Sequence, residues 1–480
     1  MSKRRCLAAA LLLLLPAALP LHADTAAVVT AANNFKATLS SSQITTLQIS
    51  YTAANAEAWT NLPGSRNGLQ LGTLSSTQLA SALTLVQTAL SDAGYSTFAA
   101  IRAADDILAK SASGYGSGNY YIVFTGAPST TSPWLLQILG HHLAYNITYN
   151  GNYIDPTPVF LGTEPPYYTS NGTTYEPLGT QRAAVQALAD AIQADSNVSS
   201  AAKLSGTFTD VVHGSNGTNS RDTNFPQAYA TGTTGRGVLY TSLTSAEQTL
   251  VQTLIAAYVN TQKSDIANPL LTHYLSSAQL AQTYIGYGVG TGGTASFPEF
   301  PSGTTTQHSY LRVDGPRCWI EFVVQQGVVY NTAIHYHSLW RDKVADYGAE
   351  FGQASTSDPG ALTSYSFFSG ATNLGSEIYY LTFPNNNVFG YYTTAFSPYL
   401  YHYDAGFFYF IDAGDSKGDA YLYDFTSSSF WFTGPTFWPY VYDFNLNSWL
   451  YYYPNASDAT HYTTSPRYFY NFNSNQIITR

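Results

Sequence analysis

Apolar residues recur at helical spacing in four stretches of the first half of the chain, residues 75–94, 96–110, 178–195 and 244–260. Each stretch places its apolar residues three or four apart, which is typical of an amphipathic helix with one buried face. The first stretch opens on Ser75 and closes on Gly94, residue types that favour a helix start and a helix stop. The pattern therefore predicts four substantial helices.

Runs rich in β-branched and aromatic residues predict strands at residues 119–126, 141–150, 309–313, 317–324 and 328–340. The last two runs are separated only by residues 325–327, which end in glycine, so we expect them to form a β-hairpin. Helices and strands do not alternate regularly along the chain. This order favours an α+β fold with a mixed or antiparallel sheet over a doubly wound parallel sheet.

The later part of the chain changes character. A Ser, Thr and Gly-rich stretch at residues 353–375 predicts a linker, and a tyrosine-rich tail follows it. A Tyr-x-Tyr pattern starts at Tyr399, Tyr421, Tyr440 and Tyr468, at spacings of 22, 19 and 28 residues. Each copy continues with His, Asp or Asn, an aromatic residue, a short polar turn and a second apolar run. The tail is expected to be an all-β module of stacked hairpins.

Two interpretations of these aromatic repeats remain open. Exposed aromatic faces can stack against sugar rings, which would make the tail a binding module for polysaccharide or other cell-envelope components. Alternatively, the tyrosine and phenylalanine side chains form the core of a small solenoid, because each repeat must bury a core before it offers a surface.

The N-terminus has the features of a secretory signal peptide. Lys3, Arg4 and Arg5 precede an apolar run at residues 6–15, and small residues lie just before Asp24. The apolar run is too short for a convincing membrane span. The expected organisation is a signal peptide at residues 1–23, an α+β domain at 24–352, the linker at 353–375 and the repeats at 376–480. The mature protein is expected to be secreted or otherwise extracytoplasmic.

Charged residues make up only 10% of the chain, and the formal net charge is −10. An acidic chain with few cations argues against a nucleic-acid partner, which requires a basic surface. Removal of the signal peptide would also remove Cys6, leaving Cys318 without a partner for an internal disulfide. Cys318 is expected to be a small buried hydrophobic residue. Packing, with or without a metal ion, must then stabilise the fold.

Four histidines are the strongest candidates for chemistry. His335 and His337 lie two residues apart on a predicted strand, so their side chains point to the same face and can converge on one ion. His141 and His142 are adjacent and would point to opposite faces of a strand. His142 would share its face with polar residues and is the preferred ligand, while His141 would pack against the site. A turn or bulge at Gly140 would reverse this choice.

Three neutral imidazoles with an open position suit zinc, copper or iron. Glu164, Glu321 or Asp342 could supply a fourth group. Glu321 lies midway along an apolar strand, where a carboxylate is costly unless it is paired. A salt bridge of Glu321 with Arg317 or Arg341 explains it equally well. In a hydrolytic reaction Glu321 or Asp342 would act as general base, whereas redox chemistry at copper or iron would make Tyr347 a candidate.

Known catalytic signatures do not compete with this set. The sequence has no G-x-S-x-G, Walker A or H-E-x-x-H motif. The glycine-rich segment at residues 286–293 follows a helical pattern and opens no helix, so it is expected to be a flexible loop.

Several segments together resemble the DUF3500 family, in the expected order and over residues 45–350. They are "WTNLPGSRNGLQLG", "YYIVFTGAPS", "GHHLAYNIT", "TPVFLGTEP", "YLRVDGPRCWIEF" and "IHYHSLWRDKVADYG". The resemblance implies a domain boundary and a site but no reaction. It puts the four histidines on motif positions, together with Arg341, Asp342, Asp346 and Tyr347. Glu164 departs from the uncharged polar residue usual there, which weakens it as a ligand.

The resemblance does not extend to the aromatic repeats, which look like an added module. The expected function is that of a secreted or surface-associated metal-binding protein, in which zinc or copper bound by histidines would support catalysis. The alternative is a non-catalytic, glycan-interacting surface protein whose histidines are structural.

Overall fold

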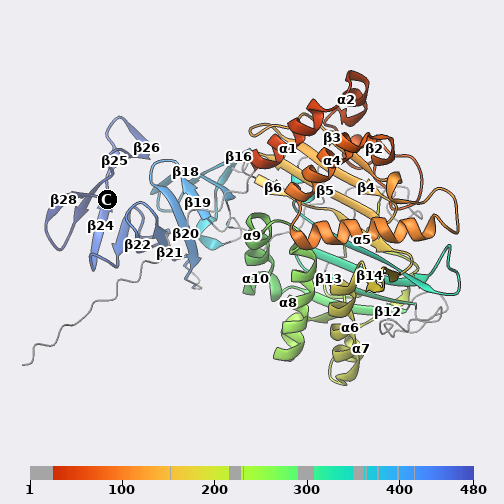
Figure 1. The fold of residues 1–480 in the computed structure, drawn as a ribbon. Coiled ribbons are helices and arrows are strands. Elements are labelled where there is room, and N and C mark those ends of the chain that lie inside the picture. The colour runs from red at the N-terminus through yellow and green to blue at the C-terminus, as the bar shows by residue number, and fades with distance from the viewer. Residues whose placement is uncertain are drawn as a thin grey trace, which may run out of the picture.

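The computed structural model describes residues 25–151, 153–215, 229–230, 232–289, 308–349, 362, 365–375, 378–396, 399–413, 415 and 417–480. The predicted signal peptide and much of the predicted linker lie outside these residues. The N-terminal part combines helices with a mixed sheet, and the C-terminal part is an antiparallel sheet (Figure 1). The predicted fold class is therefore confirmed.

Polar caps fix where two of the longer helices begin. Ser75 precedes α4 (Ser76–Ala89) and Thr244 precedes α8 (Ser245–Val259), and each hydroxyl accepts a hydrogen bond from the backbone N–H three residues later. The third helical residue, Gln78 or Glu247, bonds back to the cap and completes a capping box. The other described α-helices are α1 Thr25–Ala37, α2 Ser41–Leu47, α3 Ala53–Ala56, α5 Asp92–Leu108, α6 Gly179–Ala194, α7 Ser199–Ala202, α9 Ser264–Tyr274 and α10 Ser277–Leu280.

The N-terminal sheet has 13 strands among the described residues, in the order β1-β3-β4-β5-β7-β15-β14-β13-β12-β10, with β2, β6 and β11 attached at its sides. Among the strands that the structure describes, only β1 with β3 and β10 with β12 pair in parallel. The strands are β1 Gln48–Ile49, β2 Leu69–Gln70, β3 Tyr121–Thr125, β4 Trp134–Gly140, β5 Leu143–Asn150, β6 Tyr153–Asp155, β7 Val159–Thr163, β10 Lys203–Thr207, β11 Val238–Leu239, β12 Tyr284–Val289, β13 Ser309–Asp314, β14 Cys318–Gln326 and β15 Ile334–Asp342. A separate hairpin pairs β8 Tyr168–Ser170 with β9 Thr173–Tyr175.

Alternation along β15 divides the core into two layers. Tyr336 and Trp340 join the larger hydrophobic cluster, which also contains residues of α4, α6 and α8. These helices cover one face of the sheet (Figure 1). Leu339 points to the other face, where it packs in a smaller cluster with Trp59 and Phe160. This cluster also contains Val211 and Tyr347 from irregular segments, and alternation places His335 and His337 on the same face as Leu339.

The C-terminal sheet is one continuous antiparallel array of 11 described strands rather than a stack of separate hairpins. Its strands are β16 Thr372–Gly375, β17 Ile378–Thr382, β18 Val388–Phe396, β19 Tyr399–His402, β20 Gly406–Asp412, β21 Ala420–Asp424, β22 Ser429–Thr433, β23 Tyr440–Asp443, β24 Ser448–Tyr452, β27 Tyr468–Asn471 and β28 Gln476–Thr479. The strands β25 Pro454–Asn455 and β26 Asp458–Tyr462 form a separate pair. This sheet has a hydrophobic core of its own.

Alternation also separates the two faces of the tail. The middle residue of each Tyr-x-Tyr repeat is buried in the core of this sheet, as Leu400, Leu422, Val441 and Phe469. The first tyrosine of each repeat lies on the other face, where its exposed fraction is 42% for Tyr399, 38% for Tyr421 and 42% for Tyr440 and Tyr468. The aromatic repeats therefore contribute both a core and an exposed face.

The C-terminal sheet already begins at β16, four residues before the predicted start of the repeats at residue 376, and the predicted domain boundaries otherwise stay predictions. Within the described residues, no helix combines the length and apolar character needed to cross a membrane.

Candidate metal centre

His141 and His142 form the two-residue turn between β4 and β5, where Gly140 pairs with Leu143. The backbone of His142 has φ 60, a left-handed conformation that few residues with a side chain adopt. Its N–H donates to the Asn61 carbonyl at 3.1 Å, and its carbonyl accepts from Gly162 N–H at 2.7 Å. Because both histidines lie in this turn, strand alternation does not decide which way their side chains point. It therefore cannot select one of them as the ligand.

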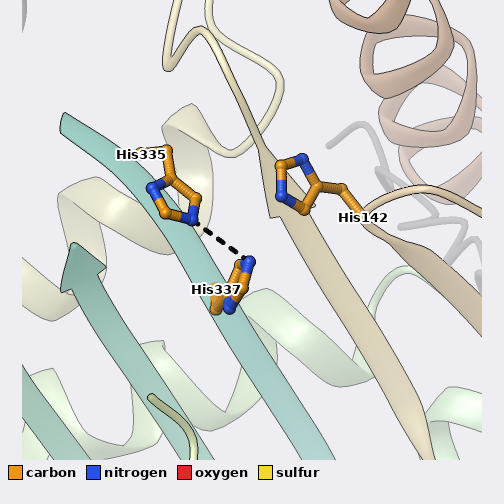
Figure 2. A group of neighbouring side chains, drawn as sticks. All are labelled: His142, His335 and His337. Carbon is orange, nitrogen blue, oxygen red and sulfur yellow. Dashed lines mark hydrogen bonds between the residues drawn. The ribbon is translucent and has the colours of Figure 1, made fainter. Parts of the chain in front are cut away.

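His335 and His337 lie on β15 and point to the same face, as their spacing predicts. Their Nε2 atoms are 3.3 Å apart, and their rings are nearly perpendicular at 84° with centroids 4.7 Å apart (Figure 2). The helices pack on the opposite face of this strand. The two imidazoles are therefore held edge to edge on the side that the irregular segments cover.

His142 completes the group from the neighbouring turn (Figure 2). One ligand nitrogen from each of His142, His335 and His337 lies within 4.8 Å of the others. The exposed fractions of the three residues are 4%, 2% and 5%, respectively. Such a group could hold one metal ion, and it unites three of the four histidines singled out in the sequence.

The Nδ1 atoms of the two β15 histidines both donate hydrogen bonds. Nδ1 of His335 donates to the Gln326 carbonyl at 2.7 Å, and Nδ1 of His337 donates to Oδ1 of Asp210 at 2.7 Å. A neutral imidazole carries only one N–H, so these bonds leave Nε2 of both rings with a bare lone pair. Backbone carbonyls and carboxylates are the usual partners that orient metal-binding histidines in this way.

Burial also favours the neutral form of His142 and His335. Desolvation lowers the pKa of His142 and of His335 well below the ordinary value, and the neighbouring imidazoles lower both further. A proton on either ring would place a positive charge in a buried site that already gathers other imidazoles. The neutral form is the one that binds metal ions, so these histidines need not lose a proton at neutral pH to act as ligands.

His141 lies beside the group rather than in it. Its ring stacks on that of His142 with centroids 3.7 Å apart, and its Nδ1 lies 2.6 Å from Oδ1 of the buried Asp105. Tyr120 donates a hydrogen bond to the His141 carbonyl at 2.8 Å. These contacts fit a residue that packs against the site, the role preferred for His141 from the sequence.

Glu321 is completely buried and receives hydrogen bonds from backbone and side-chain donors. Its carboxylate accepts from the N–H groups of Val212 and His213 and from the Tyr310 hydroxyl, at 2.5, 3.0 and 2.7 Å. Burial raises its pKa, while these hydrogen bonds oppose the rise. Arg317 and Arg341, suggested as its ion-pair partners, instead bond to Asp342 and Asp346.

Asp342 also has structural partners. It forms an ion pair with Arg317 at 2.6 Å, and its Oδ1 accepts the N–H groups of Val344 and Ala345 at 2.9 Å each. The side chain thus caps the turn after β15. Its pKa is lowered because Arg317 and these hydrogen bonds outweigh the effect of burial.

Tyr347 and Glu164 lie in further buried networks. The Tyr347 hydroxyl accepts a hydrogen bond from the Trp59 indole at 2.7 Å. Glu164 accepts the N–H groups of Val329 and Tyr330 at 2.8 and 2.7 Å. Catalytic roles for Glu321, Asp342 and Tyr347 stay predictions. Among the described residues, the carboxylates of Glu164, Glu321 and Asp342 do not belong to the histidine group.

Sequence reasoning missed Asp105, Asp210 and Gly162. Asp210 lies in "TFTDVVHG", where a single acid interrupts a strand-like run, and that interruption was the available signal. Asp105 lies within a predicted helix and resembles an ordinary exposed acid of an amphipathic pattern. Only the three-dimensional contacts connect these carboxylates with His337 and His141.

The fold and the site together define an α+β protein with a buried group of three histidines that could hold a metal ion. The chain belongs to the DUF3500 family, proteins of unknown function, whose family model matches residues 22–349. The aromatic tail lies beyond the matched region. Comparisons with curated proteins and with solved structures found no match.

Proposed function

We propose that this protein binds one divalent metal ion through His142, His335 and His337. The observation that carries the proposal is the pair of bare Nε2 atoms that face each other at 3.3 Å on β15. Two lone pairs at this distance repel unless a cation or a proton lies between them. Burial disfavours the protonated ring at His335, and a metal ion bound by both nitrogens would remove the repulsion without a proton on that ring.

The separation fits a tetrahedral ion. Zinc–nitrogen bonds of about 2.0–2.1 Å at tetrahedral angles place two ligand nitrogens roughly 3.3–3.4 Å apart. The two Nε2 atoms are 3.3 Å apart and already have this spacing. Three nitrogen donors from neutral imidazoles suit zinc or copper better than a hard cation such as magnesium.

We further propose that the site is catalytic, with zinc or copper as the ion. Three protein ligands would leave one coordination position for water or substrate, as in catalytic zinc sites. Bound zinc would supply a Lewis acid and a water of lowered pKa, while copper would permit redox chemistry. The chain's own contribution is to hold three neutral imidazoles in one buried place. The signal-like N-terminus supports a secreted or surface-associated location for this activity.

Elemental analysis tests the metal proposal directly. The chain without a histidine tag should retain one zinc or copper ion after purification in metal-supplemented medium and extensive dialysis. His142→Ala and His335→Ala should each lose it. His273→Ala is the matched control, because His273 is buried on α9 and contacts Gln279 instead of the group. Folded wild-type protein without bound metal would overturn the proposal.

A second function is proposed for the tail, binding of a polysaccharide or another glycan of the cell envelope. Its support is the exposed row of repeat tyrosines together with phenylalanines from the following repeats. The ring of Tyr399 contacts that of Phe425, and the ring of Tyr421 contacts that of Phe444, with centroids 5.8 and 6.1 Å apart. These rows carry hydroxyl groups and aromatic surface but no charge, which suits an uncharged, hydroxyl-rich partner.

Co-sedimentation of the full chain with insoluble chitin and peptidoglycan tests this second function. Replacing Tyr421 and Tyr440 by serine should remove most of the binding if the exposed row contacts the glycan. Tyr175→Ser is the control, because Tyr175 is 43% exposed but lies outside the tail. Equal sedimentation of the two variants would contradict a glycan role for the row.

A further inference from the structure

We infer that Glu321 is a positioning residue that holds the segment 208–215 so that Asp210 meets the ligand His337. The inference rests on the proposed metal site, and it assigns Glu321 a role other than that of general base. Asp210 is 3% exposed, and its Oδ1 accepts the His337 Nδ1–H at 2.7 Å.

Glu321 fixes the segment just after Asp210. Its two carboxylate oxygens accept the N–H groups of the successive residues Val212 and His213. Glu321 is 0% exposed, and its loss would leave these N–H groups without their acceptor at a costly position. The Tyr310 hydroxyl also donates to Glu321. Glu321 therefore uses both carboxylate oxygens to hold the backbone of this segment in place.

Two other side chains of the same hairpin hold the segment on either side. Gln325 on β14 donates from Nε2 to the Thr209 carbonyl, one residue before Asp210. Arg341 on β15 donates to the carbonyls of His213 and Gly214 at 2.8 and 3.0 Å. The hairpin that carries His335 and His337 therefore also anchors the loop that carries Asp210.

The chemical consequence concerns the proton of His337. With Asp210 in place, the neutral ring keeps its proton on Nδ1 and presents the lone pair of Nε2 to the metal ion. If Asp210 moves away, the proton can occupy Nε2 instead and block that ligand atom. Glu321 thus acts on the metal site through the loop, Asp210 and the tautomer of His337.

The test measures metal affinity in a double-mutant cycle. Asp210→Asn and Glu321→Gln should each weaken zinc binding by about 10–100-fold, the range found for residues that orient metal ligands. In protein that already carries Glu321→Gln, Asp210→Asn should weaken zinc binding little further, because both substitutions act through the contact of Asp210 with His337. In the cobalt-substituted protein, both variants should shift the visible spectrum in the same direction.

Asp155→Asn is the matched control. Asp155 is equally buried at 1% exposure and accepts the N–H and the hydroxyl of Thr157, at 2.9 and 2.8 Å, but it does not contact the segment. It should lower stability without changing zinc affinity. Gln325→Ala, at a partly exposed position, tests the same segment if Glu321→Gln fails to fold, and it should weaken zinc binding in the same direction.

Nitrogen NMR of the metal-free protein separates this inference from the metal proposal. The His337 ring should carry its proton on Nδ1 in the wild type and lose that preference in Glu321→Gln. This result would support the positioning role even if the wild type bound no metal. Additive losses in the cycle, or an unchanged His337 tautomer in Glu321→Gln, would overturn it.

Discussion

At the residue scale, Gly162 provides the space for the histidine group. It lies on β7 between β5 and β15, directly opposite His337 in the sheet register. A Cβ atom there would lie 2.8 Å from the Tyr336 carbonyl oxygen and 3.0 Å from Cδ2 of His142. The ring of His142 therefore rests against a position that only glycine leaves open.

Gly162→Ala should displace the His142 ring and weaken zinc binding by roughly tenfold or more, with a loss of about 1–3 kcal/mol in stability from overpacking. Competition with a chromophoric chelator measures the affinity. Gly286→Ala is the control, because its Cβ would meet the Leu204 side chain at 2.7 Å in another strand of the same sheet. Equal zinc affinities in the two variants would show that Gly162 does not support the site.

The sequence revealed only part of this geometry. The shared face of His335 and His337 follows from strand alternation, which is a local property and was predictable. The contact of His337 with Asp210 joins residues 127 positions apart, and no local pattern reports such a contact. The turn conformation of His142 was also hidden, because a φ of 60 is rare for a residue with a side chain.

At the scale of elements, most helices and strands follow the periodicity of the sequence, and the exceptions have physical causes. Gly94 does not end a helix as predicted. Helix α4 ends at Ala89, and Ser91 caps a new helix, α5. Gly94 lies in the first turn of α5. A Cβ at Gly94 would be 2.0 Å from the Thr261 carbonyl oxygen, so this glycine serves close packing.

The predicted loop at residues 286–293 was also wrong for the part that the structure describes. Residues 286–289, with Gly286 and Gly288, belong to β12, and residues 290–293 lie outside the described residues. A Cβ at these positions would meet Leu204 and Phe208 at 2.7 Å. Glycine here makes room for side chains from other segments, which the local sequence could not reveal.

The four aromatic repeats share a turn that the sequence pattern only hinted at. The residue after each Tyr-x-Tyr accepts hydrogen bonds from the backbone N–H groups two and three positions later, as His402, Asp424, Asp443 and Asn471. His, Asp and Asn can all occupy this position because each side chain offers a hydrogen-bond acceptor for the turn.

His402 makes the first of these turns sensitive to pH. Its Nδ1 accepts two backbone N–H groups and its Nε2 donates to the Phe389 carbonyl, which fixes the neutral ring. Burial lowers its pKa to about 4. The unfolded chain binds the proton more readily, so stability is full above about pH 6.5 and falls as the pH drops towards 4, by up to about 3 kcal/mol.

Amide hydrogen exchange of β19 and β20, converted to opening free energies between pH 7 and pH 4.5, measures this loss. His402→Asn is the matched variant, because asparagine keeps the turn acceptor, as Asn471 does in the last repeat, without the titrating ring. The variant should show a flatter dependence on pH over this range. Parallel curves for the two proteins would mean that another group controls the hairpin.

At the scale of the whole molecule, the histidine group and the aromatic repeats belong to different hydrophobic cores. Phe160, which contacts the His337 ring at 5.2 Å, packs in a cluster of the N-terminal sheet. Among the described residues, those buried beneath the repeats form a cluster that spans residues 362–469. Family membership covers residues 22–349 and so coincides with the part that contains the histidines.

This division leads to a prediction about how metal binding affects stability. Zinc at about 100 times its dissociation constant should stabilise the N-terminal sheet by roughly 2.7 kcal/mol, because the ion binds only the folded site. Amide hydrogen exchange should show this gain in β14 and β15, and a chelator should reverse it. The strands β21 and β22 should exchange at the same rate with and without zinc, because their core contains no residue of the group. His142→Ala is the control and should abolish the gain in β14 and β15, while an equal gain in both sheets would show that the two cores unfold as one unit.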